Sequence, residues 1–479
     1  MSASSERDAL DRPVSLFEHA QRLHRSYPDE PFPDDGRPLP GEADQPHVPH
    51  EERRLGLLAA LREFIGDPTL SAQDLHDQCA MTSFRPGDIP SVLRKLAPEP
   101  SQRLLRTARW LIRDGTDLRA VAVGLGLLRG NAERRDVAAL RIIGRLRCVE
   151  RLAVEALAAI PGAERDLVWL AERAGLFARI RVVETLVDSD DPAVRDWVRS
   201  TPRDLLSSDL ARRIAERHGL AELLHESVVT DAVWDQAGNL LLAMTDTRDN
   251  QSEIGRYEAA VTVYERWVAL ADRRPATLER AALLAMVAED LRTGPAAPVA
   301  RGLRGPLVDQ IERVLSTRSW VEMLADSAGS DDPVTVRRAE WLMREVARDN
   351  APRGRFAVRI VVPEPNPGGF PRVEARIVID GIPVVAAAFD RGPADSPQRL
   401  LHSGRLRATS EPREIKLAEA YCTEGCCGGL YVTIVREGSE VVWKDWRSST
   451  PGEPPQEMRF DAAEYDREVT RAERDRSWE

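Results

Sequence analysis

Apolar residues recur at helical spacing through a long central part of the chain, from residue 51 to about residue 350. Each of the clearest groups gives a helix with one apolar face and one charged face. These groups are Leu55, Leu58, Ala59 and Phe64; Leu104, Leu105, Ala108, Leu111 and Ile112; and Val261, Tyr264, Trp267, Val268 and Ala271. Because such helices are stable in water only when packed together, the pattern predicts an all-helical region over residues 51–350.

A repeated unit is visible inside this region. The pairs Arg135-Asp136, Arg165-Asp166 and Arg195-Asp196 lie 30 residues apart, and each follows a polar turn and a preceding helix. An Asp near the start of a helix can cap free N–H groups and suits the positive end of the helix dipole. The spacing predicts helix-turn-helix units between residues 117 and 203.

Two further segments carry an Asp-Pro turn followed by a Val-Arg helix. They are Asp191-Pro192-Ala193-Val194-Arg195 and Asp332-Pro333-Val334-Thr335-Val336-Arg337. In this pattern the chain resembles the HEAT-like helical repeat family, best over residues 100–215 and more loosely over 51–350. The resemblance implies an α-solenoid whose concave face binds another macromolecule and which has no chemistry of its own. An irregular helical bundle is the alternative fold.

The apolar period changes from helical to alternating after residue 354. Short runs rich in Val, Ile and aromatic residues predict strands at 356–362, 373–379, 383–389, 415–421, 430–435 and 441–446, the last two joined by a hairpin loop at 437–439. A final helix follows Asp461, with Glu464 placed for a capping box. We therefore expect a separate antiparallel β domain over 355–479, closed by a C-terminal helix.

The N-terminal 50 residues have a different character. Residues 14–24 show helical apolar spacing and predict a short helix within residues 1–27. Seven prolines between positions 28 and 49 give residues 28–50 the composition of an extended linker. The sequence thus predicts a helix that is tethered to the helical region without being built into it.

Composition narrows the class of protein. The 479 residues include 67 Lys or Arg and 78 Asp or Glu, a net charge of −11 that excludes a globally basic nucleic-acid coat. The longest apolar run, residues 120–128, is far shorter than the roughly 20 residues of a membrane span. No secretory signal is visible at the N-terminus, and five cysteines make no disulfide framework. We expect a cytoplasmic, bacterial protein without a membrane segment.

Positive charge is concentrated in residues 101–150, which hold 11 Arg against 5 acidic residues. Helical spacing places several of these arginines on shared faces, and they form a candidate partner-binding stripe: Arg103, Arg106, Arg109, Arg113, Arg134, Arg141 and Arg145. Such a stripe could bind nucleic-acid phosphates or an acidic protein surface. The alternative is a solvated face whose arginines pair with Asp and Glu of neighbouring repeats.

Three cysteines lie within six residues in the predicted β domain. Cys422, Cys426 and Cys427, among glycines, could hold a zinc ion if a fourth ligand came from elsewhere. A redox or regulatory thiol and small buried cysteines at the end of a strand are the alternatives. An enzyme or effector activity in this Cys-rich region would draw on Glu424 and Asp445.

Catalytic motifs are absent from the sequence. Gly124, Gly126 and Gly130 depart from the dinucleotide-binding spacing and indicate close helix packing instead. The sequence therefore predicts a noncatalytic protein-binding or scaffold protein with no cofactor. Nucleic-acid or acidic-partner binding through the arginine stripe, and an activity of the Cys-rich β domain, are the alternative functions.

Overall fold

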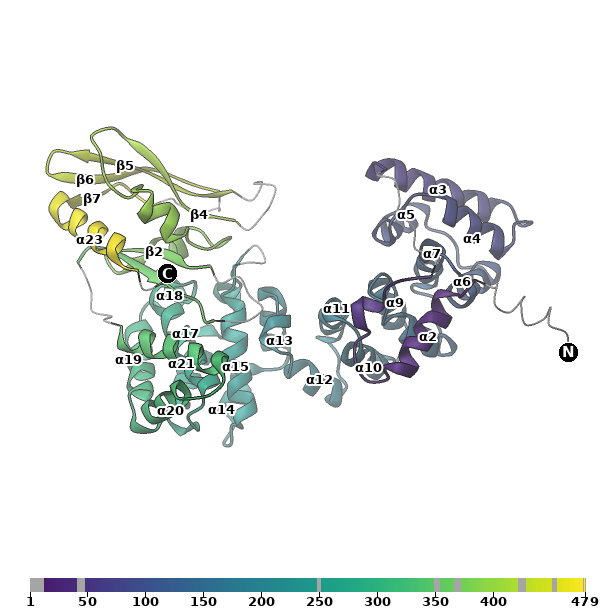
Figure 1. Cartoon of the computed structure of the whole chain (residues 1–479), viewed down its shortest axis with the longest axis horizontal. Coiled ribbons are helices and arrows are strands. Elements are labelled where there is room, and N and C mark those ends of the chain that lie inside the picture. Colours follow the sequence, from purple (N-terminus) through teal and green to yellow (C-terminus); the bar gives the residue numbers. More distant parts are fainter. Residues whose placement is uncertain are drawn as a thin grey trace. The chain divides into compact units, whose positions relative to one another are not determined.

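The computed structural model describes residues 13–40, 48–247, 251–348, 354–365, 372–420, 428–449, 455–476 and 478. The chain forms two compact units, residues 1–201 (unit 1) and residues 202–479 (unit 2). Figure 1 follows the elements of both units along the chain from purple to yellow.

The described part of unit 1 contains only helices. They are α2 (Leu16–Ser26), α3 (His50–Gly66), α4 (Ala72–Met81), α5 (Ile89–Leu96), α6 (Gln102–Asp114), α7 (Leu118–Leu128), α8 (Val137–Ile143), α9 (Glu150–Ala158), α10 (Glu164–Arg173), α11 (Leu176–Leu186) and α12 (Pro192–Arg199), with short 3-10 turns between some of them. The Asp191 carboxylate accepts the N–H groups of Ala193 and Val194 at the start of α12, as its sequence context predicts. The helical prediction is confirmed here.

Close packing of α7 against α6 and α5 depends on glycine. A Cβ atom at Gly124 would lie 2.8 Å from the Ala108 carbonyl oxygen, and one at Gly126 would lie 2.5 Å from Ile89 Cγ2. Neither position has room for a side chain. The two glycines therefore serve helix packing, as their spacing indicates.

Ion pairs join successive helix pairs of unit 1, two of them at aspartates that repeat in the sequence. Arg109 on α6 pairs with Asp136 before α8 at 2.8 Å, and Arg141 on α8 pairs with Asp166 on α10 at 3.1 Å. Arg165 on α10 pairs with Asp191 before α12, also at 3.1 Å. Asp136 and Asp166 of the repeat thus receive an arginine from the preceding helix pair. The third repeated aspartate, Asp196, pairs instead with Arg199 of its own helix, and the contact at that junction is made by Asp191 of the turn.

The N-terminal helix α2 is packed into unit 1, which corrects the prediction of a merely tethered helix. Leu16 and Ala20 are fully buried, and the Leu16 N–H donates to the Gly115 carbonyl at 3.0 Å. α2 contacts both α6 and α8. Exposure of the apolar stripe of α2 to water is unfavourable in free energy, so the helix packs against the core of unit 1.

Unit 2 begins with another helical region. Its helices are α13 (Ser208–Arg217), α14 (Leu220–His225), α15 (Asp231–Met244), α16 (Ala260–Ala269), α17 (Leu278–Thr293), α18 (Ala296–Val299), α19 (Arg304–Leu315), α20 (Arg318–Ala328) and α21 (Pro333–Ala347). Trp234 and Trp267 stack with ring centroids 4.5 Å apart, and each indole N–H donates to the other residue's carbonyl at 2.9 Å. This pair fixes α15 against α16.

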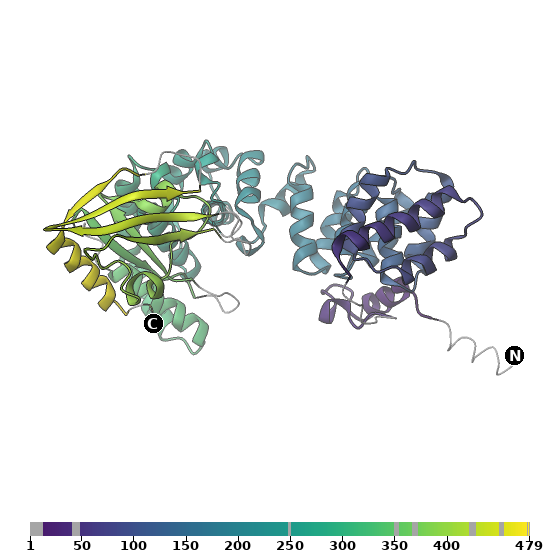
Figure 2. The same ribbon diagram turned by 90° about the horizontal axis from the view of Figure 1, so that it is seen from above.

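Two antiparallel sheets follow the helices of unit 2 (Figure 1). The first contains β1 (Phe356–Val361), β2 (Glu374–Ile379) and β3 (Ile382–Pro383), and the second contains β4 (Arg413–Glu419), β5 (Gly429–Glu437), β6 (Glu440–Ser448) and β7 (Met458–Asp461). The C-terminal helix α23 (Ala462–Arg474) starts at Asp461, whose carboxylate accepts the Glu464 N–H at 2.9 Å. Figure 2 shows the long strands of the second sheet side by side with α23. Helices followed by two antiparallel sheets and a last helix agree with the predicted order.

Two strand predictions are corrected in detail. The expected strand at 383–389 is only β3, after which Val384–Ala388 forms the short helix α22. A short apolar run has no periodicity that separates a buried strand from a buried helix, and its alanines favour the helix. The strand β7 was not predicted, because its four residues are too few for their alternation to be read as a strand, and it forms by pairing with β6.

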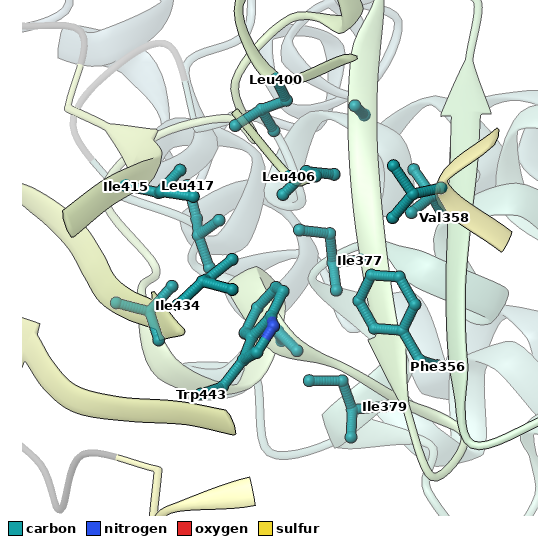
Figure 3. Packing of buried hydrophobic residues seen from close by; sticks show 14 of the residues in the cluster. Phe356, Val358, Ile377, Ile379, Leu400, Leu406, Ile415, Leu417, Ile434 and Trp443 are labelled. Carbon is teal, nitrogen blue, oxygen red and sulfur yellow. The ribbon is translucent and has the colours of Figure 1, made fainter. Parts of the chain in front are cut away.

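The core of the β region lies between the two sheets. Alternation along β1 and β2 directs one set of side chains into it, and Figure 3 shows these residues packed against residues of the second sheet and around Trp443. The labelled residues are Phe356, Val358, Ile377, Ile379, Leu400, Leu406, Ile415, Leu417, Ile434 and Trp443. The alternate residues of β1 and β2, which include Arg359 and Arg376, therefore lie on the opposite face of the first sheet.

That opposite face is joined to the helices of unit 2. Trp341 on α21 donates its indole N–H to the Val362 carbonyl at 3.0 Å, and Arg348 donates to the Ile360 carbonyl at 2.8 Å. Arg359 on β1 pairs with Glu289 on α17. The change from helix to strand occurs near residue 355, as expected, whereas the boundary between the compact units lies at residues 201 and 202.

Candidate functional site

Several arginines of the candidate stripe are bound within unit 1. Arg103 donates to the carbonyls of Phe64, Asp67 and Leu70, which follow the end of α3 or belong to it. Arg109 and Arg141 make the ion pairs between helix pairs described above. Arg134 shares Asp166 with Arg141, at 3.3 Å, and also donates to the Gly162 carbonyl at 2.7 Å. These four side chains are occupied by contacts inside the unit.

Arg145 is buried beneath the N-terminal segment, with 2% of its surface exposed. Its guanidinium donates to the Tyr27 carbonyl at 2.5 Å, to the Glu30 carbonyl, and to the Arg173 carbonyl at 3.1 Å. The Phe32 ring covers the guanidinium at 4.1 Å. Burial lowers the pKa of Arg145 to about 10, so the group remains charged at neutral pH. Arg145 fastens residues 27–32 to the helices and is not available to a partner.

Arg106 and Arg113 differ from the rest of the stripe. Both are exposed on α6, seven residues apart, and neither forms an ion pair within the described ranges of the chain. Seven residues are close to two helical turns, so the two side chains lie on the same face. Of the seven arginines, these two are the exposed ones without an ion pair among the described residues; Arg134 is also exposed, but it pairs with Asp166.

The structure does not test the cysteine cluster. Cys422, Cys426 and Cys427 lie outside the described residues, between β4 and β5. Within the described ranges, no group of three or more His, Cys, Asp or Glu side chains is arranged to hold a metal ion. Trp443 lies in the core between the sheets, and Asp445 is exposed on β6. The zinc hypothesis therefore stays a prediction.

A charged cluster in unit 2 lies where α17 crosses the first sheet. Antiparallel register places Arg359 of β1 directly opposite Arg376 of β2, a juxtaposition of like charges that is unfavourable by itself. Glu289 of α17 meets this pair: Arg359 Nε lies 2.7 Å from its Oε2, and the Thr293 hydroxyl donates to its Oε1 at 2.5 Å. Burial raises the pKa of Glu289, but the two arginines and Thr293 outweigh burial and leave it below its usual value.

The next residue on α17, Asp290, has no such partner. It is 8% exposed, and its Oδ2 atom is buried without a hydrogen-bond partner among the residues that the structure describes. Arg376 is bound to Glu374 at 2.8 Å and to the Thr293 hydroxyl at 3.3 Å. Burial raises the pKa of Asp290 to about 7, against which Arg376 and Thr245 act only in part. A buried, unpaired carboxylate that titrates near neutral pH is a typical mark of a functional site.

Asp290 lines a cavity of about 660 Å³ within unit 2. Its walls combine apolar side chains, among them Met286, Trp341 and Phe389, with charged ones. Acidic residues outnumber arginines on the lining, seven against three: Asp204, Asp246, Glu289, Asp290, Glu345, Glu364 and Glu374, with Arg203, Arg372 and Arg376. A concave apolar site with a few charged groups has the character of a ligand site.

The sequence analysis did not single out these carboxylates, although a signal exists. α17 reads Leu-Glu-Arg-Ala-Ala-Leu-Leu-Ala-Met-Val-Ala-Glu-Asp-Leu-Arg-Thr, which is apolar on nearly all sides. A helix without a wide polar face is buried, and charged residues near its end must then be buried as well. The pair Glu289-Asp290 could have been marked as buried acid on this ground.

Gly294, immediately after α17, leaves space for the Asp290 carboxylate. A Cβ atom at this position would lie 1.7 Å from Asp290 Oδ1. The φ angle of Gly294 is −94°, which any residue adopts, so an alanine here conflicts with Asp290 and not with the backbone. We expect Gly294→Ala to lower the free energy of unfolding by about 1–3 kcal/mol through overpacking.

A double-mutant cycle separates this contact from other effects. In an Asp290→Ala background the carboxylate is absent, so the added Gly294→Ala change should cost less than about 0.5 kcal/mol in urea unfolding. An equal cost of Gly294→Ala in both backgrounds would show that the glycine does not act through Asp290.

Comparison with known proteins identifies no relative. No family model matches the chain, and neither a curated protein nor a solved structure is significantly similar to it. The described helices include none that is both long and apolar enough to cross a membrane. What the protein does must therefore be argued from its own residues.

Proposed function

We propose that this protein is a noncatalytic binding protein whose unit 1 is a HEAT-like α-solenoid that serves as a scaffold for a protein partner. The observation that carries the proposal is the series of ion pairs from Arg109, Arg141 and Arg165 to an aspartate at or before the start of the next helix pair, namely Asp136, Asp166 and Asp191. A contact that recurs at each junction is what stacked repeats require. Stacked helix pairs provide an extended surface suited to macromolecular binding.

The free charges of unit 1 favour a partner with an acidic surface. Arg106 and Arg113 share one exposed face of α6 and have no ion pair in the part of the chain that the structure describes. Exposed charges at an interface mainly steer association and suppress wrong partners. A carboxylate-bearing protein surface complements this face.

The same two exposed arginines make nucleic acid a weaker candidate partner than an acidic protein surface. Two free arginines release the counterions of about two phosphates, which corresponds to a slope near −2 in a plot of log affinity against log salt. Proteins that hold nucleic acid by charge use roughly 6 to 10 phosphate contacts. We expect no binding of duplex DNA or RNA at physiological salt; a steep salt dependence that disappears in Arg106→Glu/Arg113→Glu would contradict this.

Purification of the full-length chain from its native host tests the scaffold function. We expect one protein to co-purify in stoichiometric amount and the Arg106→Glu/Arg113→Glu variant to bind it about tenfold more weakly, since each reversed rim charge contributes about 0.5–1 kcal/mol. The charge-matched control is Arg301→Glu/Arg313→Glu, at exposed positions of unit 2. Equal loss in both double variants would show that only net charge matters and would remove α6 from the binding surface.

A further inference from the structure

We propose that the cavity lined by Asp290 binds an organic monocation, a guanidinium or primary ammonium group on an apolar stem, with Asp290 as its counter-ion. This site lies entirely within unit 2 and does not depend on partner binding by unit 1.

Of the five carboxylates that α17, α21 and the first sheet with the segment after β1 bring to the cavity, Asp290 is the one without an ion pair among the described residues. Glu289 is bound by Arg359, and Glu374 by Arg376. Glu345 pairs with Arg348 at 3.3 Å, and Glu364 pairs with both Arg203 and Arg338. Asp290, 8% exposed and with an oxygen that lacks any hydrogen-bond partner, has no arginine of its own. A cation brought by a ligand supplies the missing partner.

The walls of the cavity suit the rest of such a ligand. Met286 and Trp341 from the helices and Val385 and Phe389 from the region of α22 give apolar surface close to the charged groups. A guanidinium offers several N–H donors in one plane and binds carboxylates at two points, while an apolar stem gains from leaving water. A volume of about 660 Å³ is ample for a group of this size.

An unpaired buried carboxylate is costly for the fold, and its persistence points to a use. The pKa of Asp290, raised to about 7 by burial, measures that cost. Such local costs concentrate at sites that bind or react. A bound cation would lower this pKa, so binding releases a proton and strengthens as the pH rises.

The charged and titratable groups around Asp290 come from every element packed on it. They are Glu289 on α17, Glu345 on α21, Arg359 on β1, and Glu374 and Arg376 on β2, with Arg203, Asp204, Asp246, Glu364 and Arg372 elsewhere on the lining. Of these, Glu345 also has a pKa raised by burial. The Asp290→Asn variant therefore has to be compared at each pH to assign the linkage to Asp290.

Calorimetric titration of the full chain with n-butylguanidinium tests the site, and n-butylurea is the neutral control of the same shape. We expect butylguanidinium to bind and butylurea not to bind. The affinity should rise about tenfold from pH 6 to pH 8, as the ionised fraction of a group with a pKa of about 7 rises. Asp290→Asn should abolish binding, and Asp326→Asn, at an exposed position on α20, should leave it unchanged.

The source of the cation is tested by a second pair of ligands. A short peptide with one arginine and the same peptide with citrulline, which is neutral and nearly isosteric, are titrated in parallel. Preference for the arginine peptide over butylguanidinium indicates a side chain of a protein partner, and the reverse order indicates a free small molecule. Either order supports the cation site.

Three results would overturn the proposal. They are equal binding of butylguanidinium and butylurea, butylguanidinium binding that survives in Asp290→Asn, and absence of binding by both the small cation and the arginine peptide at millimolar concentration. Asp290→Asn removes a buried negative charge that has no ion-pair partner among the described residues, so no arginine loses its counter-charge. We therefore expect the variant to fold, and loss of binding can be assigned to the missing carboxylate.

Discussion

Asp290→Asn should make the protein more stable at pH 8. The carboxyl of the unfolded chain ionises near the usual value of 3.8, but that of the folded chain ionises only near pH 7, because burial disfavours the charge. The folded state therefore holds the proton more tightly between these two values, and its stability falls as the pH rises through that window. Asparagine does not ionise, so the stability of the Asp290→Asn variant does not decrease with pH for this reason.

The expected size follows from the shift of about three pKa units at roughly 1.4 kcal/mol each. Asp290→Asn should raise the free energy of unfolding of unit 2 by up to about 4 kcal/mol at pH 8 and by less than about 1 kcal/mol at pH 4. Urea unfolding at the two pH values, followed by the fluorescence of the buried Trp234 and Trp267, measures the difference.

The neighbouring carboxylate is the control and should respond with the opposite sign. Glu289 is paired with Arg359 and its pKa lies below the usual value, so Glu289→Gln leaves the half-buried Arg359 without its counter-charge. Removing one partner of such a pair costs about 3–5 kcal/mol. Destabilisation by both substitutions at pH 8 would show that Asp290 is paired in solution.

Arg145→Leu should destabilise unit 1 strongly. The guanidinium donates to the carbonyls of Tyr27, Glu30 and Arg173, and leucine cannot satisfy these groups. Each buried carbonyl left without a donor costs about 1–3 kcal/mol, so we expect a loss of at least about 3 kcal/mol. Residues 27–32 should also lose their anchor, which amide hydrogen exchange or limited proteolysis would detect as exposure of this segment.

Arg106→Leu is the matched control, because it makes the same change on the same unit at an exposed arginine without an ion pair among the described residues. Its effect on stability should stay within about 0.5 kcal/mol. If Arg145→Leu were equally mild and left residues 27–32 protected, the segment would be held by something other than the guanidinium.

The order of elements could be predicted because their apolar periods are clear. Helical spacing over residues 51–350 and alternation after residue 354 hold in the structure. Two of the three repeated aspartates, Asp136 and Asp166, do form contacts between helix pairs, whereas Asp196 pairs with Arg199 of its own helix. Errors arose at α22 and β7, where the segments are too short for a period to be read.

Which charged side chains form hydrogen bonds or ion pairs could not be predicted from their spacing. Helical spacing placed Arg103, Arg106 and Arg113 on related faces, but whether each is bound depends on carbonyls and carboxylates that are distant in sequence. Arg145 reaches residues more than 110 positions away. The unpaired state of Asp290 likewise depends on the register of β1 against β2, which gives Arg359 to Glu289 and leaves none for its neighbour.

The two proposed sites lie in different units and differ in their effect on stability. Unit 1 uses its buried arginine and its ion pairs between helix pairs for stability, and Arg106 and Arg113 are the exposed arginines of the stripe without an ion pair among the described residues. Unit 2 retains a carboxylate that weakens its fold. Partner binding and cation binding can thus be lost separately, through variants at α6 and at α17.

The central claim, that this is a scaffold and not an enzyme, is tested most directly by the mass of the complex that the full-length chain forms in its native host. We expect light scattering of the purified complex to give the mass of one chain plus one protein partner in fixed ratio, without turnover in a metal-supplemented hydrolase screen. A chain that elutes alone, with turnover in that screen that Asp290→Asn or loss of the cysteines abolishes, would contradict the account.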